Sequence, residues 1–291
     1  MLGPVGIWSR VFVWGSAAQA RELAQEAEEL GYGALWYGEA GTGKESLSNA
    51  TMLLAATRRI TVATGISNIW ARDATAMRAG GDTISEAFPG RFLHGLGVSH
   101  VSQVSARGHD YGKPVSTMRA YLDAMDAAEY TAPAPQEPTP RVLAALRPKM
   151  LELARDRTAG AHSYFMPPSH SRRARAVLGD GPILAAEQPV VLETDPVRAR
   201  EIAREHTAIY LSMPNYVNAL RWLGFDESDV EGAGSDRLVD SIVAWGDVDA
   251  ISARVREHRD AGATHVAVQA LGSFSSVPGQ LRELAPALLG E

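Results

Sequence analysis

Cysteine is absent from this sequence of 291 residues, and lysine occurs only three times, as Lys44, Lys113 and Lys149. The absence of cysteine excludes disulfide bonds and thiolate metal sites. Long apolar runs are also missing, so we expect no membrane-spanning helix, and the amino terminus lacks the pattern of a signal peptide. The formal charge of −6 gives no electrostatic reason to expect nucleic acid as a partner. These absences together predict a cytoplasmic protein.

A helix is expected from Ser16 to Gly31, where alanine and leucine recur on one face at helical spacing. Ser16 and Gln19 resemble a capping box, and Gly31 suits a left-handed carboxyl-terminal cap. A short apolar run, residues 32–40, follows at once. This order of helix, tight turn and buried strand predicts a repeating unit.

The same unit recurs along the chain, so that strands alternate with helices. Eight strands are expected, at residues 5–9, 32–40, 60–68, 91–100, 140–148, 160–168, 189–196 and 264–272. Nearly all are continuous apolar runs, which is typical of parallel strands covered on both faces. Eight such units predict a single domain over residues 1–291, an α/β fold of the (β/α)₈ TIM barrel type. An open, doubly wound sheet is the alternative that the pattern leaves.

Two segments exceed a minimal barrel, and we interpret them as insertions at about 98–140 and 195–246. The first holds a glycine-bounded loop, a helix near 115–129 and the proline-rich stretch TAPAPQEPTP, which is expected to be an extended linker. The second holds two or three helices. It either packs on the barrel or forms a lid over its mouth.

The catalytic groups of a barrel lie at the carboxyl ends of its strands, and the side chains at these ends are here small, polar or aromatic. A Gly-x-Gly occurs at Gly95 and Gly97, but it lacks the third glycine of a dinucleotide-binding fingerprint and is weak evidence by itself. No lysine lies within an expected strand, which disfavours an aldolase-type enzyme because a Schiff-base lysine has no place there. His94, His100 and His109 do not have the spacing of metal ligands, so no metal is expected.

Residues 60–100 and 142–162 carry a more specific pattern. The stretches GALWYGEA, ITVATGISNIWARDATAMRAGGDTISEAFPGRFLHGLGVSH, RGHDYGKP and RVLAALRPKMLELARDRTAGAH resemble the bacterial luciferase-like superfamily, in particular its branch of oxidoreductases that depend on the deazaflavin coenzyme F420. The closing stretch VAWGDVDAISARVREHRDAGATHVAVQAL is similar as well. The resemblance covers nearly the whole chain. It implies a barrel with insertions, usually a homodimer, in which coenzyme F420 or alternatively FMN lies across the carboxyl-terminal mouth.

The resemblance also implies where the coenzyme ring lies. Gly95 and Gly97 would end the fourth strand without side chains, so that the ring can approach the backbone there and bind beside Gly97 and Val98. A non-proline cis peptide would join Gly65 to Ile66 and form a bulge behind the ring. Asn68 would then bond the bulged chain or the edge of the ring.

A phosphate site is expected after the fifth strand, which leads through Ala145 and Leu146 into a helix. Arg147 and Lys149 flank Pro148 at the start of this helix, and cations at a helix amino terminus make a good anion site. With the resemblance, we interpret this segment as the site of the coenzyme phosphate. The alternative is a solvated first turn in which Pro148 merely takes the first helical position.

The catalytic pattern of the relatives is incomplete in this chain. Many relatives have a histidine where this chain has Ala40, so we expect His100 to protonate the reduced substrate, with Glu39 as a second acid–base candidate. Glu39 could instead form a structural ion pair with an arginine, and His100 could be an ordinary loop histidine. The substrate pocket is expected to contain Trp8, Trp70, His109 and Phe165.

These residues predict an F420-dependent oxidoreductase that exchanges a hydride with an unidentified small organic substrate, such as a hydrophobic carbonyl, imine or enone. An FMN-dependent luciferase-like monooxygenase or reductase on the same barrel is one alternative. A relative that binds flavin without catalysis is another, and Ala40 is the residue that suggests it.

Overall fold

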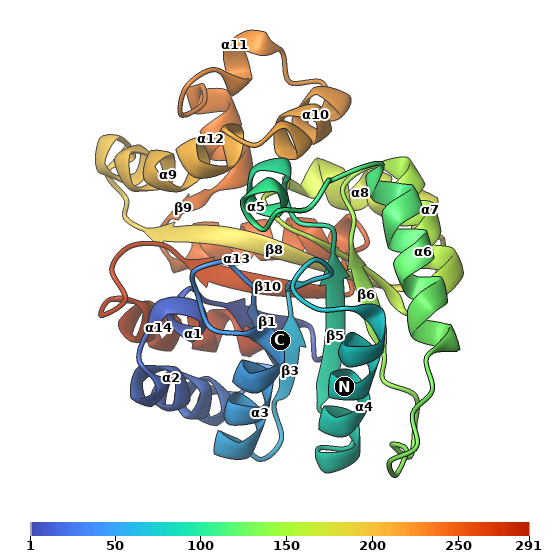
Figure 1. The fold of residues 1–291 in the computed structure, drawn as a ribbon. Helices are drawn as coiled ribbons and strands as arrows, with labels where there is room; N and C mark the ends of the chain where they lie inside the picture. Colours follow the sequence, from blue (N-terminus) through green and yellow to red (C-terminus); the bar gives the residue numbers. More distant parts are fainter. Residues whose placement is uncertain (1, 291) are drawn as a thin grey trace.

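The strands form one continuous parallel sheet over residues 2–290, which the computed structural model describes. The eight barrel strands are, in order around the barrel, β1 (Val5–Trp8), β2 (Ala34–Tyr37), β3 (Thr61–Thr64), β5 (Phe92–Gly97), β6 (Arg141–Ala144), β7 (Gly160–Ser163), β8 (Ile183–Leu192) and β10 (His265–Ala270). Strand β10 pairs with both β8 and β1, which closes the sheet (Figure 1). The predicted (β/α)₈ barrel is therefore confirmed, and the open sheet is excluded.

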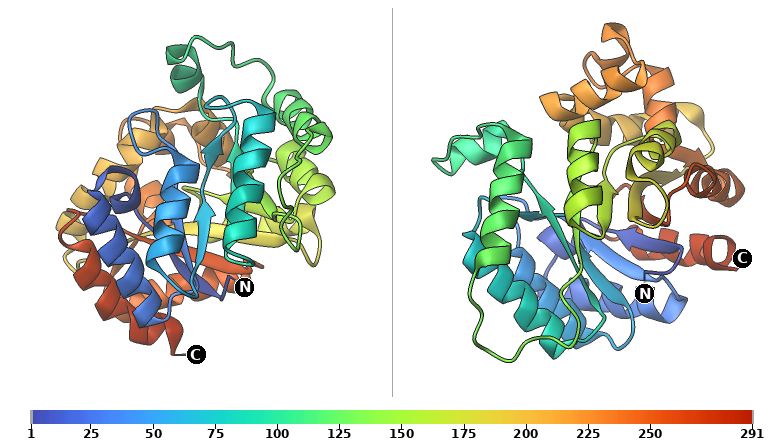
Figure 2. Two further views of the ribbon diagram at one scale, coloured as in Figure 1. Left: turned by 60° about the horizontal axis from the view of Figure 1, so that its bottom comes forward. Right: turned by 90° about the vertical axis from the view of Figure 1, so that its right-hand side faces the viewer.

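A helix follows each barrel strand and covers the outside of the barrel, as the two views of Figure 2 show. The ring helices are α2 (Ala17–Leu30), α3 (Ser46–Ala56), α4 (Ala74–Ala87), α6 (Pro114–Ala127), α7 (Pro148–Arg157), α8 (Pro168–Leu178), α13 (Val248–Asp260) and α14 (Val277–Leu289). The predicted capping box of Ser16 and Gln19 begins α2, and Gly31 ends it in the left-handed conformation. Within residues 2–290, every helix is too short or too polar to cross a membrane.

The seventh barrel strand begins earlier than the sequence pattern indicated. We expected it at 189–196, but β8 starts at Ile183. The first half of β8 was not recognised from the sequence because it contains Glu187 and leads to Pro189, and a carboxylate and a proline are uncommon in a buried strand. The strand tolerates Pro189 although proline has no N–H to donate. On one side, β8 pairs with β7 up to Ala186 and with the short strand β9 (Ala244–Gly246) from Val190 onward. Residue 189 lies between these two partners, where no hydrogen bond from its backbone nitrogen is needed.

The two predicted insertions differ in kind. The helix within 98–140 is α6, which packs between α4 and α7 as an ordinary ring helix, and the added element there is the short helix α5 (Val101–Ala106). A short helix α1 (Val11–Trp14) and a short strand β4 (Ser67–Asn68) are further additions. The segment 195–246 adds α9 (Pro196–Leu211), α10 (Pro214–Leu223), α11 (Glu227–Val230) and α12 (Asp236–Ile242), which Figure 1 shows as a group above β8. We call these four helices the helical insertion.

Two apolar clusters hold the fold together. The larger lies between the strands and the ring helices. The smaller fills the barrel interior and continues into the helical insertion. Trp36 and two histidines pack together inside the barrel: Trp36 Nε1 donates to His265 Nε2 at 2.9 Å, and the Trp36 ring stacks on His162 with centroids 4.6 Å apart. Because the insertion and the barrel interior share one core, the insertion is an integral part of the fold.

Candidate active site

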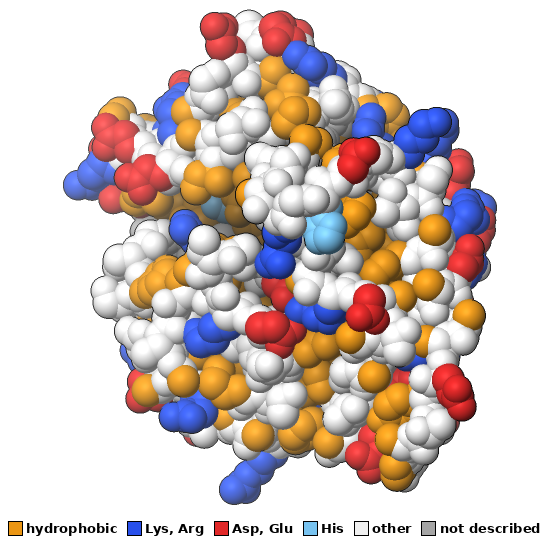
Figure 3. All heavy atoms as spheres, viewed as in Figure 1, with side chains coloured by type: hydrophobic (Ala, Val, Ile, Leu, Met, Phe, Trp, Pro, Cys, Tyr) orange, Lys and Arg blue, Asp and Glu red, His pale blue; other side chains and the backbone are white. Residues whose placement is uncertain are grey.

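A cavity of about 1380 Å³ lies at the carboxyl ends of the barrel strands. The segments after β1, β2, β3, β5 and β6 form one side of it, and α9 and α10 of the helical insertion form the other. Figure 3 shows the molecule hollowed between the insertion and the barrel, with hydrophobic and basic side chains bordering the hollow. This is the mouth at which TIM barrels carry their chemistry. The volume exceeds the roughly 300–1,000 Å³ that a single small ligand occupies.

One wall of the cavity is made almost entirely of backbone. We call Gly38, Gly65, Ile66, Gly97 and Val98 the glycine wall. The Gly65–Ile66 peptide bond in it is cis, as predicted. A Cβ added at Gly97 would lie 2.4 Å from Ile66 Cγ1, and one added at Gly65 would lie 2.9 Å from Nε2 of the buried His162. Gly97 therefore makes room for Ile66, and through Ile66 it shapes the apolar surface of the wall.

Glu39 borders the cavity, but its carboxylate is committed to a structural ion pair. Arg72 binds both carboxylate oxygens, and the backbone N–H groups of Ser46 and Asn68 donate to them at 3.3 and 2.7 Å. The Glu39 N–H donates in turn to the carbonyl of Ile66 at 3.0 Å. The structure thus favours the ion-pair interpretation. Glu39 positions the chain at Ile66, which we call the bulge of the glycine wall, and both of its carboxylate oxygens already accept hydrogen bonds.

Three residues expected at the cavity support it from behind. Asn68 is 1% exposed, and its Oδ1 accepts the N–H of Trp70 at 3.0 Å. Trp70 Nε1 donates to the carbonyl of Val98 at 3.0 Å, and His109 packs on the Trp70 ring with centroids 5.4 Å apart. Asn68, Trp70 and His109 are not among the residues that line the cavity. They hold the chain that follows β5.

Ala145 and Phe165 also lie off the cavity wall, one just beyond the end of β6 and the other beyond the end of β7. Each is almost fully buried, whereas the neighbours Leu146 and Tyr164 line the cavity. Ala144 and Leu146 line the cavity on either side of Ala145, because alternate side chains of an extended chain face the same way, whereas Phe165 lies where the chain turns after β7. Phe165 adopts a left-handed φ of 62°, and its N–H donates to Glu187 Oε2 at 2.9 Å.

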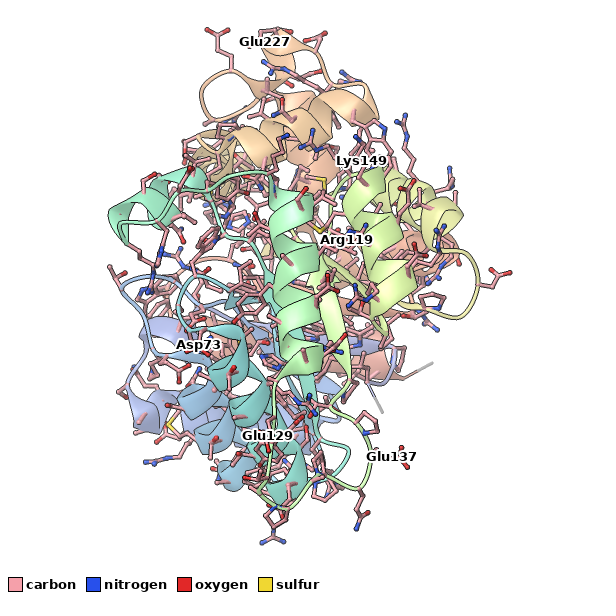
Figure 4. The ribbon with its side chains drawn as sticks, turned by 45° about the vertical axis from the view of Figure 1, so that its right-hand side comes forward. Asp73, Arg119, Glu129, Glu137, Lys149 and Glu227 are labelled. Carbon is pink, nitrogen blue, oxygen red and sulfur yellow. The ribbon has the colours of Figure 1, made fainter. Side chains whose placement is uncertain are left out.

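Arg147 and Lys149 flank the start of α7 and both line the cavity. Pro148 is the first residue of this helix, as predicted. Both cationic side chains are exposed and form no ion pair with any residue between 2 and 290. Figure 4 shows Lys149 at the end of α7 that faces the helical insertion, whereas Glu137 lies on the linker at the opposite end of the molecule. Two unpaired cations at a helix amino terminus suit an anionic ligand group.

His100 lies on the cavity wall between the barrel and the helical insertion. Its Nδ1 bonds to Asn215 Oδ1 of α10 at 2.9 Å, and its ring centroid lies 5.5 Å from that of Tyr216. With the Asn215 oxygen as acceptor, Nδ1 carries the proton, and Nε2 of the neutral ring has a free lone pair. Burial lowers the pKa of His100 below its ordinary value of 6.5, although the bond to Asn215 opposes this. The ring is therefore neutral at pH 7 and can accept a proton at Nε2.

Another part of the cavity wall is aromatic, and sequence reasoning missed most of it. We call Trp8, Tyr164, Tyr210 and Tyr216 the aromatic wall. The Tyr164 ring lies 5.1 Å from that of Trp8 and 5.0 Å from that of Tyr210, which lies 5.2 Å from that of Tyr216. The Tyr164 hydroxyl bonds that of Tyr210 and donates to Gln269 Oε1, both at 2.8 Å. Strand alternation could have identified Tyr164, but no motif marks Tyr210 and Tyr216 on α9 and α10.

The residues present fit a coenzyme with a flat ring and a phosphate group. Ile66 offers the ring an apolar surface without bulk around it, and Arg147 and Lys149 offer the phosphate two unpaired cations. Within residues 2–290, histidine and carboxylate side chains do not gather in groups of three that could hold a metal ion. The arrangement therefore suits redox chemistry on an organic coenzyme.

Comparison with protein families decides the assignment. The model of the luciferase-like monooxygenase family matches residues 5–265. The chain belongs to the luciferase-like monooxygenase family. No curated protein matches it.

Solved structures extend the likeness of this luciferase-like chain at low sequence identity. An F420-dependent secondary alcohol dehydrogenase in complex with an F420–acetone adduct is 15% identical with a TM-score of 0.77, over 99% of both chains. A coenzyme F420-dependent tetrahydromethanopterin reductase from Methanopyrus kandleri is 16% identical with a TM-score of 0.75, over 98% of this chain and 99% of that one. The oxygenating constituent of 3,6-diketocamphane monooxygenase from Pseudomonas putida, in complex with FMN, is 16% identical with a TM-score of 0.68, over 98% of both. These likenesses concern the fold.

Proposed function

We propose that this protein is an F420-dependent oxidoreductase that exchanges a hydride with a small organic substrate. The observation that carries the proposal is that the glycine wall and the unpaired cations Arg147 and Lys149 border one cavity. The wall suits a flat ring, and the cations suit its phosphate. Two of the three solved structures described above are F420-dependent enzymes, which makes F420 the first coenzyme to test.

A bound deazaflavin would supply a carbon centre that accepts or releases a hydride. The chain's own residues must then place the substrate and manage the proton. Neutral His100 can accept the hydroxyl proton of an alcohol at Nε2 while its Nδ1–H is held by Asn215. In the reverse direction the imidazolium returns this proton to the carbonyl oxygen. From the sequence we expected His100 to donate a proton. Because burial favours the neutral ring, His100 instead acts first as a base, and it donates the proton only in the reverse direction.

The remaining residues of the cavity would orient the ligands and exclude water. Glu39 and Arg72 hold the bulge of the glycine wall in place from behind. The aromatic wall would cover the substrate side, and three of its four side chains, Trp8, Tyr164 and Tyr216, are buried. Ala40 also lines the cavity and contributes no proton-transfer group, so this part of the chemistry falls to His100.

The test is a titration of coenzyme-free protein with F420 and, separately, with FMN, followed by fluorescence. Binding of F420 without binding of FMN, together with bleaching of the deazaflavin absorbance when secondary alcohols are added, is the expected result. Binding of FMN alone would replace the proposal with the monooxygenase or reductase alternative. Binding of either coenzyme without hydride transfer to any alcohol, carbonyl, imine or enone would identify a non-catalytic relative.

A further inference from the structure

The charges on the cavity wall are unbalanced. Four cationic side chains line it: Arg10, Arg107, Arg147 and Lys149. Glu39 is the one carboxylate among the described residues that line it, and its charge is neutralised by Arg72. A concave wall with this surplus attracts anions. The coenzyme phosphate assigned above accounts for Arg147 and Lys149 only.

Arg10 lies too far around the barrel to share that phosphate site. It follows β1, whereas Arg147 and Lys149 follow β6. In the closed order β1, β2, β3, β5, β6, β7, β8, β10, strands β1 and β6 are four steps apart in either direction, so they stand on opposite sides of the mouth. Arg10 is exposed and forms no ion pair within residues 2–290. Its positive charge is therefore available to a second anion.

Arg10 lies beside a large apolar side chain, and further apolar side chains line the same cavity. Its guanidinium lies 5.1 Å from the centroid of the Trp14 ring, and Trp14 is 43% exposed. Ile209 of α9 is 42% exposed, and both Trp14 and Ile209 line the cavity. The aromatic wall adjoins them: burial raises the pKa of Tyr210 to about 12, and the nearby charge of Arg10 opposes that rise. Exposed apolar groups of this size gathered at a cavity mark a binding surface.

We infer that the substrate of this protein is an amphipathic organic acid, whose flat apolar body lies between Trp14, Ile209 and the aromatic wall and whose carboxylate binds Arg10. An unpaired guanidinium beside a ring is suited to this ligand, because it can donate two hydrogen bonds to a carboxylate while the ring covers the apolar part. The inference rests on the proposed function in one respect: that function assigns the side of Arg147 and Lys149 to the coenzyme, which leaves the side of Arg10 for the substrate.

The experiment measures binding of two matched probes to the coenzyme-free protein by isothermal titration calorimetry. The probes are 2-naphthoate and 2-naphthamide, which have the same ring system and differ in charge. We expect the acid to bind at least about tenfold more tightly than the amide. Arg10→Gln should abolish that preference, and Arg10→Lys should retain part of it. Arg21→Gln, at an exposed arginine on α2 away from the cavity, should leave it unchanged.

Three results would overturn the inference. The first is a wild-type protein that does not distinguish the acid from the amide. The second is a preference for the acid that survives Arg10→Gln. The third is a preference that disappears when Arg147 and Lys149 are both changed to alanine but not when Arg10 is changed, because the acid would then occupy the proposed phosphate site. Since no coenzyme is present, a protein that binds neither F420 nor FMN but prefers the acid through Arg10 would refute the proposed function and leave this inference standing.

Discussion

The glycine wall and the aromatic wall line one cavity, but they are built from different parts of the chain. The glycine wall is backbone at the ends of β2, β3 and β5, braced from behind by the ion pair of Glu39 and Arg72. The aromatic wall is made of side chains, and two of its four rings come from the helical insertion. The proposed coenzyme surface therefore belongs to the barrel strands themselves. The proposed substrate surface depends in part on the helical insertion, whose core is continuous with the barrel interior.

Acid should destabilise the whole fold, and with it both walls, and this is the largest effect that we expect. Six buried histidines have a pKa that burial lowers to about 3 or 4: His94, His162, His170, His206, His258 and His265. Below pH 6.5 the unfolded chain takes up a proton at each of them and the folded chain does not, so each lowers stability by about 1.4 kcal/mol per pH unit. Glu187 opposes this by one proton, because burial raises its pKa to about 8. The midpoint of urea unfolding should fall steeply from pH 7 to pH 5.

His206→Phe provides the control for the acid prediction. His206 packs against Phe165 and Tyr210 of the aromatic side, and its Nε2 has no partner among the described residues. The variant should be as stable as the wild type at pH 7 or more so, with a shallower dependence on pH. An unchanged slope would show that His206 titrates in the folded protein.

Gly97→Ala should damage the glycine wall and spare the aromatic wall. The new Cβ would meet the side chain of Ile66 at 2.4 Å, and overpacking of this kind costs about 3 kcal/mol of unfolding free energy. We expect coenzyme binding to be lost at temperatures where the protein is still folded, while 2-naphthoate still binds. Gly279→Ala in α14, where the Cβ meets no atom within 4 Å, should leave coenzyme binding intact. Coenzyme affinity that survives in Gly97→Ala would refute the assignment of this wall.

His100→Gln tests the residue that joins the two walls. Loss of the base should lower turnover about 10²-fold, equivalent to about 2.7 kcal/mol, while coenzyme affinity is kept. In the wild type, alcohol oxidation should decline as the pH falls through the lowered pKa of His100, because the protonated ring cannot accept a proton. That acidic decline should be absent from the variant. Pre-steady-state rates measured against pH check both points, and wild-type turnover in the variant would assign the proton to another group.

Changing Arg147 and Lys149 together to alanine should have the smallest effect, on the coenzyme side alone. Loss of two charge-assisted contacts should weaken F420 binding by about 2 kcal/mol, which is about 30-fold in the dissociation constant. The preference for 2-naphthoate over 2-naphthamide should remain. An unchanged F420 dissociation constant would place the phosphate elsewhere.

The sequence sufficed to predict most of the barrel, and ten of the fifteen expected site residues line the cavity. Seven of the eight strands were placed by their apolar runs, because a strand buried on both faces leaves a continuous signal. The first half of β8 was missed because Glu187 and Pro189 interrupt that signal, although Pro189 lies where no partner needs its N–H. The cis bond at Gly65–Ile66 was predicted from a resemblance, and it was confirmed.

Local order was determined by the sequence alone: helices whose caps and apolar stripes lie within one segment, strands between them, and the absence of cysteine chemistry. Only the tertiary structure decided which side chains face the cavity. Tyr164 and Phe165 are neighbours just beyond the end of β7, yet Tyr164 lines the cavity and Phe165 does not, because Phe165 adopts a left-handed φ of 62° and turns the chain there. His100 and Asn215 are 115 residues apart and meet at 2.9 Å. Contacts of this kind depend on how the barrel closes and where the helical insertion packs, and no short stretch of sequence encodes either.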